Sequence, residues 1–331
     1  MGIYKDRVTI YEVAKAAGVS LATVSRVINN QSNVRSDTKQ KVEETIARLG
    51  YKPNALAQGL ATNRTTNIGI VIPDVNYVHI SNLLSGMIDI GKIYGYQTTL
   101  FITKHSKQDT RDVIAKLVTS HVDGAVVFDD ELEEDDIKNI ISYNIPLVVI
   151  GREVIGEKVG CITIDFVKTL VKVLKKAADD GKKVKFIKTS TQGNMTSIVD
   201  DELTDLLPEG SCETFTITDS YHETYSTFVD YFKKNKNTNS VYVAPRDSLA
   251  CAIENAATDL GLKVPEDVQV VSIVGTKYSY LARPTISSCD IDMYEIGSIA
   301  MRMVTKILKD ELKDKKFAFE AKFTSRGSTK Y

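Results

Sequence analysis

The feature that most constrains this fold is a pair of short amphipathic segments near the amino terminus, separated by a glycine. In the first segment, apolar side chains fall on one helical face at i, i+3, i+4 and i+7, namely those of Ile10, Val13, Ala14 and Ala17. Gly18 follows where a helix can end in the left-handed backbone conformation, which costs glycine no steric strain. The pattern predicts a helix that stops at a tight turn.

A second helix is predicted directly after this turn. Ser20 has the short polar side chain that caps helix amino termini, and Val24, Val27 and Ile28 give the next segment an apolar stripe. Two short helices joined by a glycine turn form a helix-turn-helix, whose second helix enters the major groove of DNA. Small three-helix cores without nucleic acid share this pattern, so the motif alone leaves a structural role open.

A third helix completes this predicted bundle. It has a polar cap and first turn at residues 36–38, an apolar stripe at Val42, Ile46 and Leu49, and a stop at Gly50. Three such helices are enough to bury one small core.

Residues 54–61 predict a hinge helix that folds only on a partner. The segment follows Pro53, has few charges, contains Gly59 and has one large apolar side chain, Leu60. A helix this short is marginal in isolation. On DNA, Leu60 can wedge between base steps in the minor groove.

Charge is distributed unevenly along the 331 residues. The whole chain has 42 Lys and Arg against 43 Asp and Glu, but residues 1–66 contain ten basic and five acidic side chains. A basic amino-terminal part on an acidic body fits attraction to phosphate at one end of the chain.

Several function classes lack their usual signals. The cysteines and histidines show no metal or redox spacing, so we expect no cofactor and no metal. There is no signal peptide and no long apolar run, which indicates a cytoplasmic protein without a membrane segment. A glycine-rich phosphate loop and a nucleophile elbow are both missing, so an enzyme is not expected.

From residue 68 onward, apolar strands alternate with helices. The expected strands are 68–73, 98–102, 125–128 and 147–150 in a first series, and 161–164, 184–187, 214–217, 240–244 and 270–274 in a second. The expected helices are 81–94, 108–120, 135–143, 166–179, 224–235 and 247–260. Such alternation predicts doubly wound parallel sheets with helices on both faces. We therefore expect two α/β subdomains with a cleft at the carboxyl ends of their strands.

Three segments of the amino-terminal region resemble a known family. Residues 10–14 (IYEVA), 19–29 (VSLATVSRVIN) and 50–55 (GYKPNA) resemble the lac repressor family of bacterial transcription regulators, and within it the regulators of carbon catabolite control. The resemblance is dense in the first 75 residues and the last 40, and thin between about 189 and 239.

The resemblance implies an α/β fold with an all-α helix-turn-helix head and hinge helix, followed by two subdomains of the periplasmic-binding-protein-like type I. A last helix, 292–309, and a strand, 317–323, would return to the first sheet. The implied domains are a DNA-binding domain at 1–53, a hinge and linker at 54–66, a first subdomain at 67–162 with 291–325, a second subdomain at 163–290 and a tail at 326–331.

The resemblance also implies a homodimer on a pseudo-palindromic double-stranded DNA operator. Arg26 is the candidate for a guanine edge, and Leu21 and Ala22 are candidates for thymine methyl groups. Other contacts position the protein on the backbone. The complete expected set is Thr9, Ser20, Leu21, Ala22, Thr23, Ser25, Arg26, Asn29, Tyr51, Asn54, Ala57 and Leu60.

The predicted cleft lacks two ligands of sugar-responsive relatives. Those relatives have an arginine after the strand equivalent to 184–187 and an aspartate after the strand equivalent to 270–274, and neither is present here. Asp247 does match a family position. With Asn76 and Lys277 it makes the expected effector site, so a small-molecule effector stays open.

The last predicted helix favours a protein input instead. Its core stripe would be Ile296, Ile299, Ala300, Met303 and Ile307, with Glu295, Ser298, Arg302, Thr305 and Lys309 on the opposite face. From composition alone this opposite face is an ordinary solvated surface. The resemblance matches this helix and residues 325–330 to segments that dock serine-phosphorylated HPr, which implies Tyr94, Arg302, Thr305 and Arg326 as corepressor contacts. A planar guanidinium suits phosphate because it can donate two parallel hydrogen bonds.

The sequence therefore predicts a transcription regulator of carbon catabolite control that is activated by serine-phosphorylated HPr. The alternative is a sugar-responsive repressor with its effector between the subdomains. A free sugar-binding protein of the periplasmic type is disfavoured by the DNA-binding head and the missing signal peptide.

Overall fold

The computed structural model divides the chain into two compact units, Met1–Thr65 and Thr66–Tyr331. It describes residues 8–29, 31, 33–52, 65–104, 107–129, 132–189, 207, 210–235 and 239–331. We call the described part of the first unit the head and the second unit the core.

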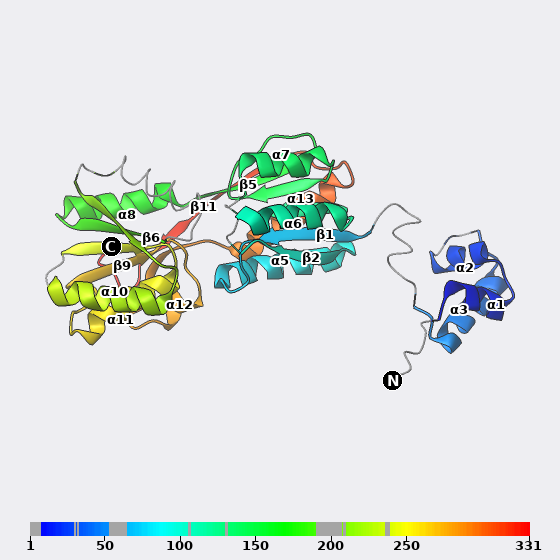
Figure 1. Cartoon of the computed structure of the whole chain (residues 1–331), viewed down its shortest axis with the longest axis horizontal. Helices are drawn as coiled ribbons and strands as arrows, with labels where there is room; N and C mark the ends of the chain where they lie inside the picture. Colours follow the sequence, from blue (N-terminus) through cyan, green and yellow to red (C-terminus); the bar gives the residue numbers. More distant parts are fainter. Residues whose placement is uncertain are drawn as a thin grey trace. The chain divides into compact units, whose positions relative to one another are not determined.

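The head is a bundle of three helices (Figure 1): α1 (Ile10–Ala17), α2 (Leu21–Ile28) and α3 (Ser36–Leu49). Val13, Ala17, Val24 and Val42 are buried at its centre, as their spacing predicts. The cap of α3 differs from the prediction: the N-cap residue is Arg35, and no side chain caps this helix.

The core contains two six-stranded sheets, each the centre of one subdomain. The first subdomain contains β1 (Asn67–Ile72), α5 (Val78–Tyr94), β2 (Gln97–Ile102), α6 (Lys107–Thr119), β3 (Gly124–Val127), α7 (Glu134–Ser142), β4 (Leu147–Ile150), β5 (Val159–Asp165), α13 (Met293–Ile307) and β11 (Lys316–Glu320). Its strands are parallel in the order β11-β5-β4-β3-β1-β2. Alternate residues of β1 point to opposite faces: Ile70 packs with α5 and α13, and Val71 packs with α6 and α7.

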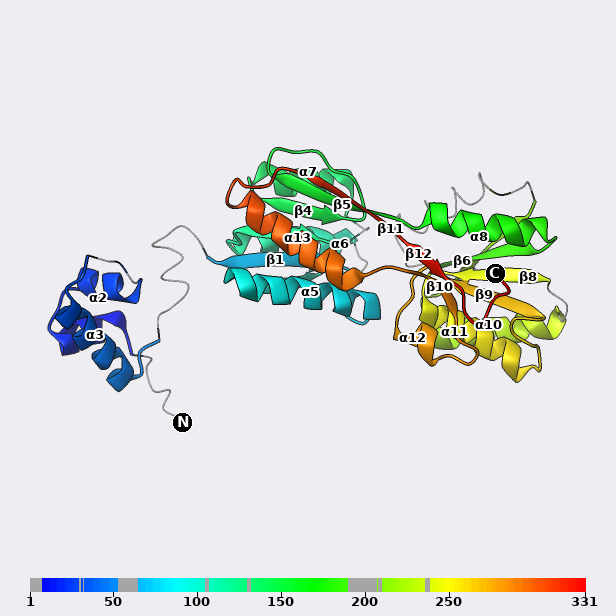
Figure 2. The same ribbon diagram turned by 180° about the vertical axis from the view of Figure 1, so that it is seen from behind.

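The second subdomain repeats this plan (Figure 2). It contains α8 (Val167–Asp179), β6 (Lys183–Thr189), β7 (Cys212–Ile217), α10 (Tyr221–Lys234), β8 (Ser240–Ala244), α11 (Asp247–Asp259), β9 (Val268–Ser272), α12 (Lys277–Leu281), β10 (Ser287–Asp290) and β12 (Lys322–Thr324). The strand order is β12-β10-β9-β8-β6-β7. One core lies between the sheet and α8, and the other lies between the sheet and the pair α10 and α11.

The chain passes between the subdomains three times, and two of these crossings differ from the sequence prediction. The strand at 161–164, expected to begin the second series, is part of β5 and pairs with β4 and β11 in the first sheet. The strand expected at 317–323 is two strands separated by Ala321. β11 joins the first sheet, whereas β12 pairs antiparallel with β10 in the second.

Other element boundaries also differ. α5 begins at Val78 instead of residue 81, so Val78 to Ile80 form its first turn. α12 and β10 lie in a segment for which no element was predicted. Among the residues that the structure describes, no helix is long and apolar enough to cross a membrane.

Candidate functional site

The turn between α1 and α2 has the geometry that its glycine and serine predict. Gly18 has a φ of 63°, and its N–H and that of Val19 donate to the last carbonyls of α1. Ser20 caps α2 by accepting a hydrogen bond from the Thr23 N–H at 3.1 Å. These caps set where α1 ends and where α2 begins.

The outer face of α2 carries the predicted DNA-reading residues. Val24 and Val27 are buried against the rest of the head, so the opposite side of the helix is open to solvent. The exposed residues on that side are Ser20, Leu21, Ala22, Ser25, Arg26 and Asn29, and Thr23 is half-buried at its edge. A helix with one face in a core and the other lined by short polar side chains and one arginine can lie in a major groove.

Other predicted DNA contacts have local partners or lie outside the described residues. Thr9 caps α1 through a capping box with Glu12, and its hydroxyl donates to Glu12 Oε2 at 2.9 Å. These bonds hold the pKa of Glu12 below its usual value. Tyr51 is half-buried and packs on the head core. The expected contacts outside the described residues are Asn54, Ala57 and Leu60.

One exposed aromatic side chain of the head was absent from the predicted contacts. Tyr11 in α1 is 69% exposed. Its position one residue after Ile10 places it away from the apolar stripe, and that offset was the available sequence signal. An aromatic ring with a hydroxyl group at this surface is a candidate contact to the DNA backbone.

The predicted effector residues are not assembled into an open polar site. Asp247, at the start of α11, is 2% exposed, and its Oδ2 accepts hydrogen bonds from the N–H and hydroxyl groups of Thr276 and Ser279. Four donors saturate one carboxylate oxygen, so this atom anchors the loop before α12. Asn76 is exposed and bonds to Asp74, and Lys277 is exposed on α12.

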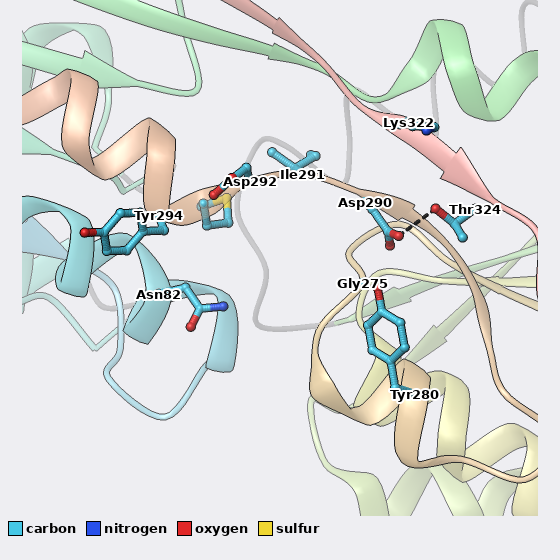
Figure 3. A pocket seen from close by; sticks show the side chains of 10 residues that line it. Asn82, Gly275, Tyr280, Asp290, Ile291, Asp292, Tyr294, Lys322 and Thr324 are labelled. Atoms are coloured by element: carbon cyan, nitrogen blue, oxygen red, sulfur yellow. Dashed lines mark hydrogen bonds between the residues drawn. The ribbon is translucent and has the colours of Figure 1, made fainter.

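A groove of about 500 Å³ lies beside the crossings between the subdomains (Figure 3). Tyr280 and Asp290 line it from the second subdomain, and Tyr294 lines it from the first. The carboxylate of Asp290 is already engaged, because it accepts hydrogen bonds from Thr324 at 2.6 Å and Arg326 at 2.7 Å. None of the three predicted effector residues lines this groove.

The predicted corepressor residues separate into two exposed and two enclosed side chains. Arg302 on α13 and Tyr94 at the end of α5 are exposed. The expectation that Thr305 faces outward is wrong: it is 1% exposed, and its hydroxyl donates to the Arg302 carbonyl. Ser298 is buried as well, because α13 packs against α5 on that side.

Arg326 is also unsuited to the predicted role. Its side chain pairs with Asp290, donates to the Ser288 hydroxyl at 2.6 Å and stacks 4.4 Å from the Tyr280 ring. These contacts keep it within the second subdomain, away from Arg302. A guanidinium with all these partners has little capacity left for a phosphate.

Three exposed basic side chains lie at the end of α13, and we call them the basic stripe. Arg302 and Lys306 are exposed on α13 at i and i+4. Lys309 is exposed in the turn after this helix, and its Nζ lies 5.4 Å from the Tyr94 ring centroid. In the part of the chain that the structure describes, neither Arg302 nor Lys306 forms an ion pair. The stripe can therefore accept an anionic partner.

Comparison with known proteins identifies the family. Residues 9–54 match the model for bacterial regulatory proteins of the lacI family, and residues 222–329 match the periplasmic binding protein-like domain. The chain is 33% identical over 328 residues to catabolite control protein A of Staphylococcus aureus, across 98% of this chain and 99% of that protein. The chain belongs to the lac repressor family.

This family member is therefore a DNA-binding transcription regulator and not an enzyme. It is also 32% identical over 337 residues to an HTH-type transcriptional regulator, pepR1, of Lactobacillus delbrueckii, across 98% of each chain. A solved lac repressor dimer bound to operator and an anti-inducer has the same fold, with a TM-score of 0.83 at 19% identity and coverage of 98% of this chain and 99% of that one. The predicted family and fold class are confirmed.

Proposed function

We propose that this regulator acts in the cytoplasm as a homodimer, on a pseudo-palindromic operator, in carbon catabolite control. The observation that carries the DNA-binding half is the outer face of α2, on which Leu21, Ala22, Ser25, Arg26 and Asn29 are exposed together. Two such helices related by two-fold symmetry would read two half-sites one helical turn, or a multiple of it, apart.

The homodimer is supported by exposed apolar side chains in both subdomains. On α5, Ile88 and Ile93 face solvent, and on α12 Tyr280 and Leu281 do the same. A second copy of the chain could cover these exposed apolar side chains. A second copy of the chain is the partner that a palindromic DNA site requires.

The input that we propose is serine-phosphorylated HPr, bound at the basic stripe. A phosphoserine carries nearly two negative charges at neutral pH and three acceptor oxygens. Arg302 is the exposed guanidinium of the stripe, and Tyr94 flanks it. Similarity to catabolite control protein A supports this choice of input.

A sugar effector receives less support from the core. Buried sugar hydroxyls need several fixed polar partners. The side chain that matches a family position, Asp247, bonds at Oδ2 to Thr276 and Ser279. Titration calorimetry with a panel of sugars would test this alternative directly.

The deciding experiment measures operator affinity with and without serine-phosphorylated HPr at fixed salt. Arg302→Ala should abolish the stimulation and leave basal affinity unchanged, since a charge-assisted hydrogen bond contributes roughly 1.5–3 kcal/mol. Arg302→Lys should restore part of it, because lysine keeps the charge and loses the planar fork.

Arg111→Ala is the matched control for this experiment. Arg111 is an exposed arginine on α6, which covers the opposite face of the same sheet. Its removal should change nothing. If wild-type regulator fails to bind serine-phosphorylated HPr at micromolar concentrations, the proposed input is wrong.

A further inference from the structure

Three side chains meet where the two subdomains face one another. Tyr77 precedes α5 in the first subdomain, and Asp219 and Arg246 follow β7 and β8 in the second. The Tyr77 hydroxyl donates to Asp219 Oδ2 at 2.8 Å. The guanidinium of Arg246 forms an ion pair with Asp219 and lies 4.3 Å from the centroid of the Tyr77 ring. Each of the three groups thus contacts both of the others.

The ion pair between Arg246 and Asp219 is buried, so the stability of each charge depends on these contacts. The side chains of Arg246 and Asp219 are each 10% exposed. Arg246 Nε and Nη1 have no hydrogen-bond partner among the described residues. A buried charge that loses its counter-ion is strongly unfavourable, so Asp219 and the Tyr77 ring hold Arg246 in place.

Tyr77 also packs on a row of aromatic side chains in the first subdomain. The His79 ring stacks on Tyr77 with centroids 5.6 Å apart, and the edge of Phe128 meets His79 at 6.3 Å. Burial, with Arg246 as the second cause, lowers the pKa of His79 to about 4. The imidazole is therefore neutral at physiological pH and does not repel the guanidinium.

We propose that Tyr77, Asp219 and Arg246 form a latch that holds the two subdomains closed with no small molecule between them. Asp219 and Arg246 are charged groups that could attract a polar ligand, and they pair with one another. Tyr77 ties them to the opposite subdomain. The latch goes beyond the proposed function and does not depend on it, because it concerns the core without DNA or HPr.

The test is a distance measurement by pulsed electron paramagnetic resonance on the full chain. Spin labels replace Lys138 on α7 and Lys233 on α10, which are exposed and lie in different subdomains. Attachment through azide-bearing unnatural amino acids leaves the four native cysteines in place, and excess unlabelled chain removes distances between copies. Without any ligand, the wild type should show one narrow distance population.

Three latch variants should change this population, and Tyr77→Phe should change it least. Asp219→Asn keeps the shape and removes the charge, and it should shift more than half of the molecules to longer distances. Tyr77→Phe keeps the ring and loses one hydrogen bond, so it should shift a smaller fraction. Combined Asp219→Leu and Arg246→Met removes the latch without leaving a buried charge, which keeps the core folded, and it should open as far as Asp219→Asn.

Glu213→Gln is the matched control. It breaks an ion pair of 2.6 Å with Lys185 that lies within the second subdomain, so the distance population should stay unchanged. The latch is refuted if Asp219→Asn and the double variant give the wild-type distances. It is also refuted if the distance distribution of the ligand-free wild type is already as broad as those of the variants.

Discussion

At the scale of single residues, Arg26 is the side chain that we expect to read a base. It is the only exposed arginine on the outer face of α2. We predict that Arg26→Ala costs roughly 1–3 kcal/mol of binding free energy on the best operator and flattens the preference at one base pair in each half-site. Affinity measured on a set of single-base operator variants would show this.

Arg48→Ala provides the comparison for Arg26. Arg48 is exposed in the last turn of α3, so its removal takes away the same charge from a different helix. We expect a weaker loss that is equal for all operator sequences. If Arg26→Ala gives that same uniform loss, Arg26 contacts phosphate and not bases.

Another residue with a testable property is Glu254, in the middle of α11. It is 1% exposed, and neither carboxylate oxygen has a hydrogen-bond partner among the described residues. Burial raises the pKa of Glu254 from 4.5 to about 8. Between these two values the folded state binds more protons than the unfolded chain, so the free energy of unfolding should fall as pH rises.

We predict that Glu254→Gln flattens this pH dependence. The amide has nearly the same shape and cannot ionise, so the variant should be more stable than wild type at pH 8 and above. One group accounts for at most about 1.4 kcal/mol per pH unit. Melting of the core at pH 5.5, 7 and 8.5 is the measurement, and equal slopes in both proteins would contradict the assignment.

At this scale the sequence predicted surface residues better than enclosed ones. The face of α2 followed from spacing alone, because a two-helix motif leaves only one side of the second helix free. The sequence did not reveal that Arg326 is already paired, because its partners, Asp290 and Tyr280, come from β10 and α12, where no element was predicted. Thr305 was misassigned because helical spacing cannot show that a neighbouring helix covers part of the polar face.

At the scale of elements, the contact between α5 and α13 is the tightest packing that can be tested. A Cβ on Gly86 would lie 2.0 Å from the Tyr294 carbonyl oxygen, and one on Gly297 would lie 2.1 Å from that of Leu83. We predict that Gly86→Ala and Gly297→Ala each destabilise the core by about 1–3 kcal/mol or more, because backbone atoms cannot move aside as a side chain can.

Gly91→Ala tests whether the close approach is the cause. Gly91 lies in the same helix, α5, but its nearest contact for an added Cβ is 3.4 Å. Alanine should be neutral there or stabilise by up to about 1 kcal/mol. Chemical denaturation of all three variants distinguishes a packing effect from a general loss of helix glycine.

The elements themselves were predicted well where each strand is followed by its own helix. Strand 147–150 and strand 240–244 have the predicted bounds. Prediction failed where the chain changes sheet. β5 has the pattern of any other apolar strand, and it pairs both with β4 and with β11, which is 155 residues further along the chain. Periodicity cannot reveal such long-range pairing.

At the scale of the whole molecule, the prediction concerns assembly. If the exposed apolar side chains of α5 and α12 form the interface of a homodimer, Ile93→Lys and Leu281→Lys should each raise the dissociation constant about tenfold or more, a loss of about 1.4 kcal/mol. Light scattering coupled to size-exclusion chromatography over a dilution series measures this.

Ile155→Lys is the control for the assembly prediction. Ile155 is 91% exposed and lies in the loop between β4 and β5, away from both helices. Its replacement should leave the assembly unchanged. A chain that is monomeric at micromolar concentration before any substitution would contradict the dimer.

α5 connects the latch to the start of the core. It has 17 residues, hence a length of about 25 Å. One end begins at Tyr77, in the latch. Beyond the other end, Gln97 donates to the carbonyl of Thr66 at 2.8 Å, and the Thr66 N–H donates to Asp123 at 2.8 Å.

Thr66 is the first residue of the core, so the end of α5 that is far from Tyr77 lies beside the start of the core. Gly86, where α5 packs closely against α13, lies at the middle of the helix. A tilt of about 5° around this contact would move either end of α5 by about 1 Å, given eight residues on each side. Loss of the Tyr77 contacts would thus shift the start of the core through a rigid movement of α5, without any unfolding of the core.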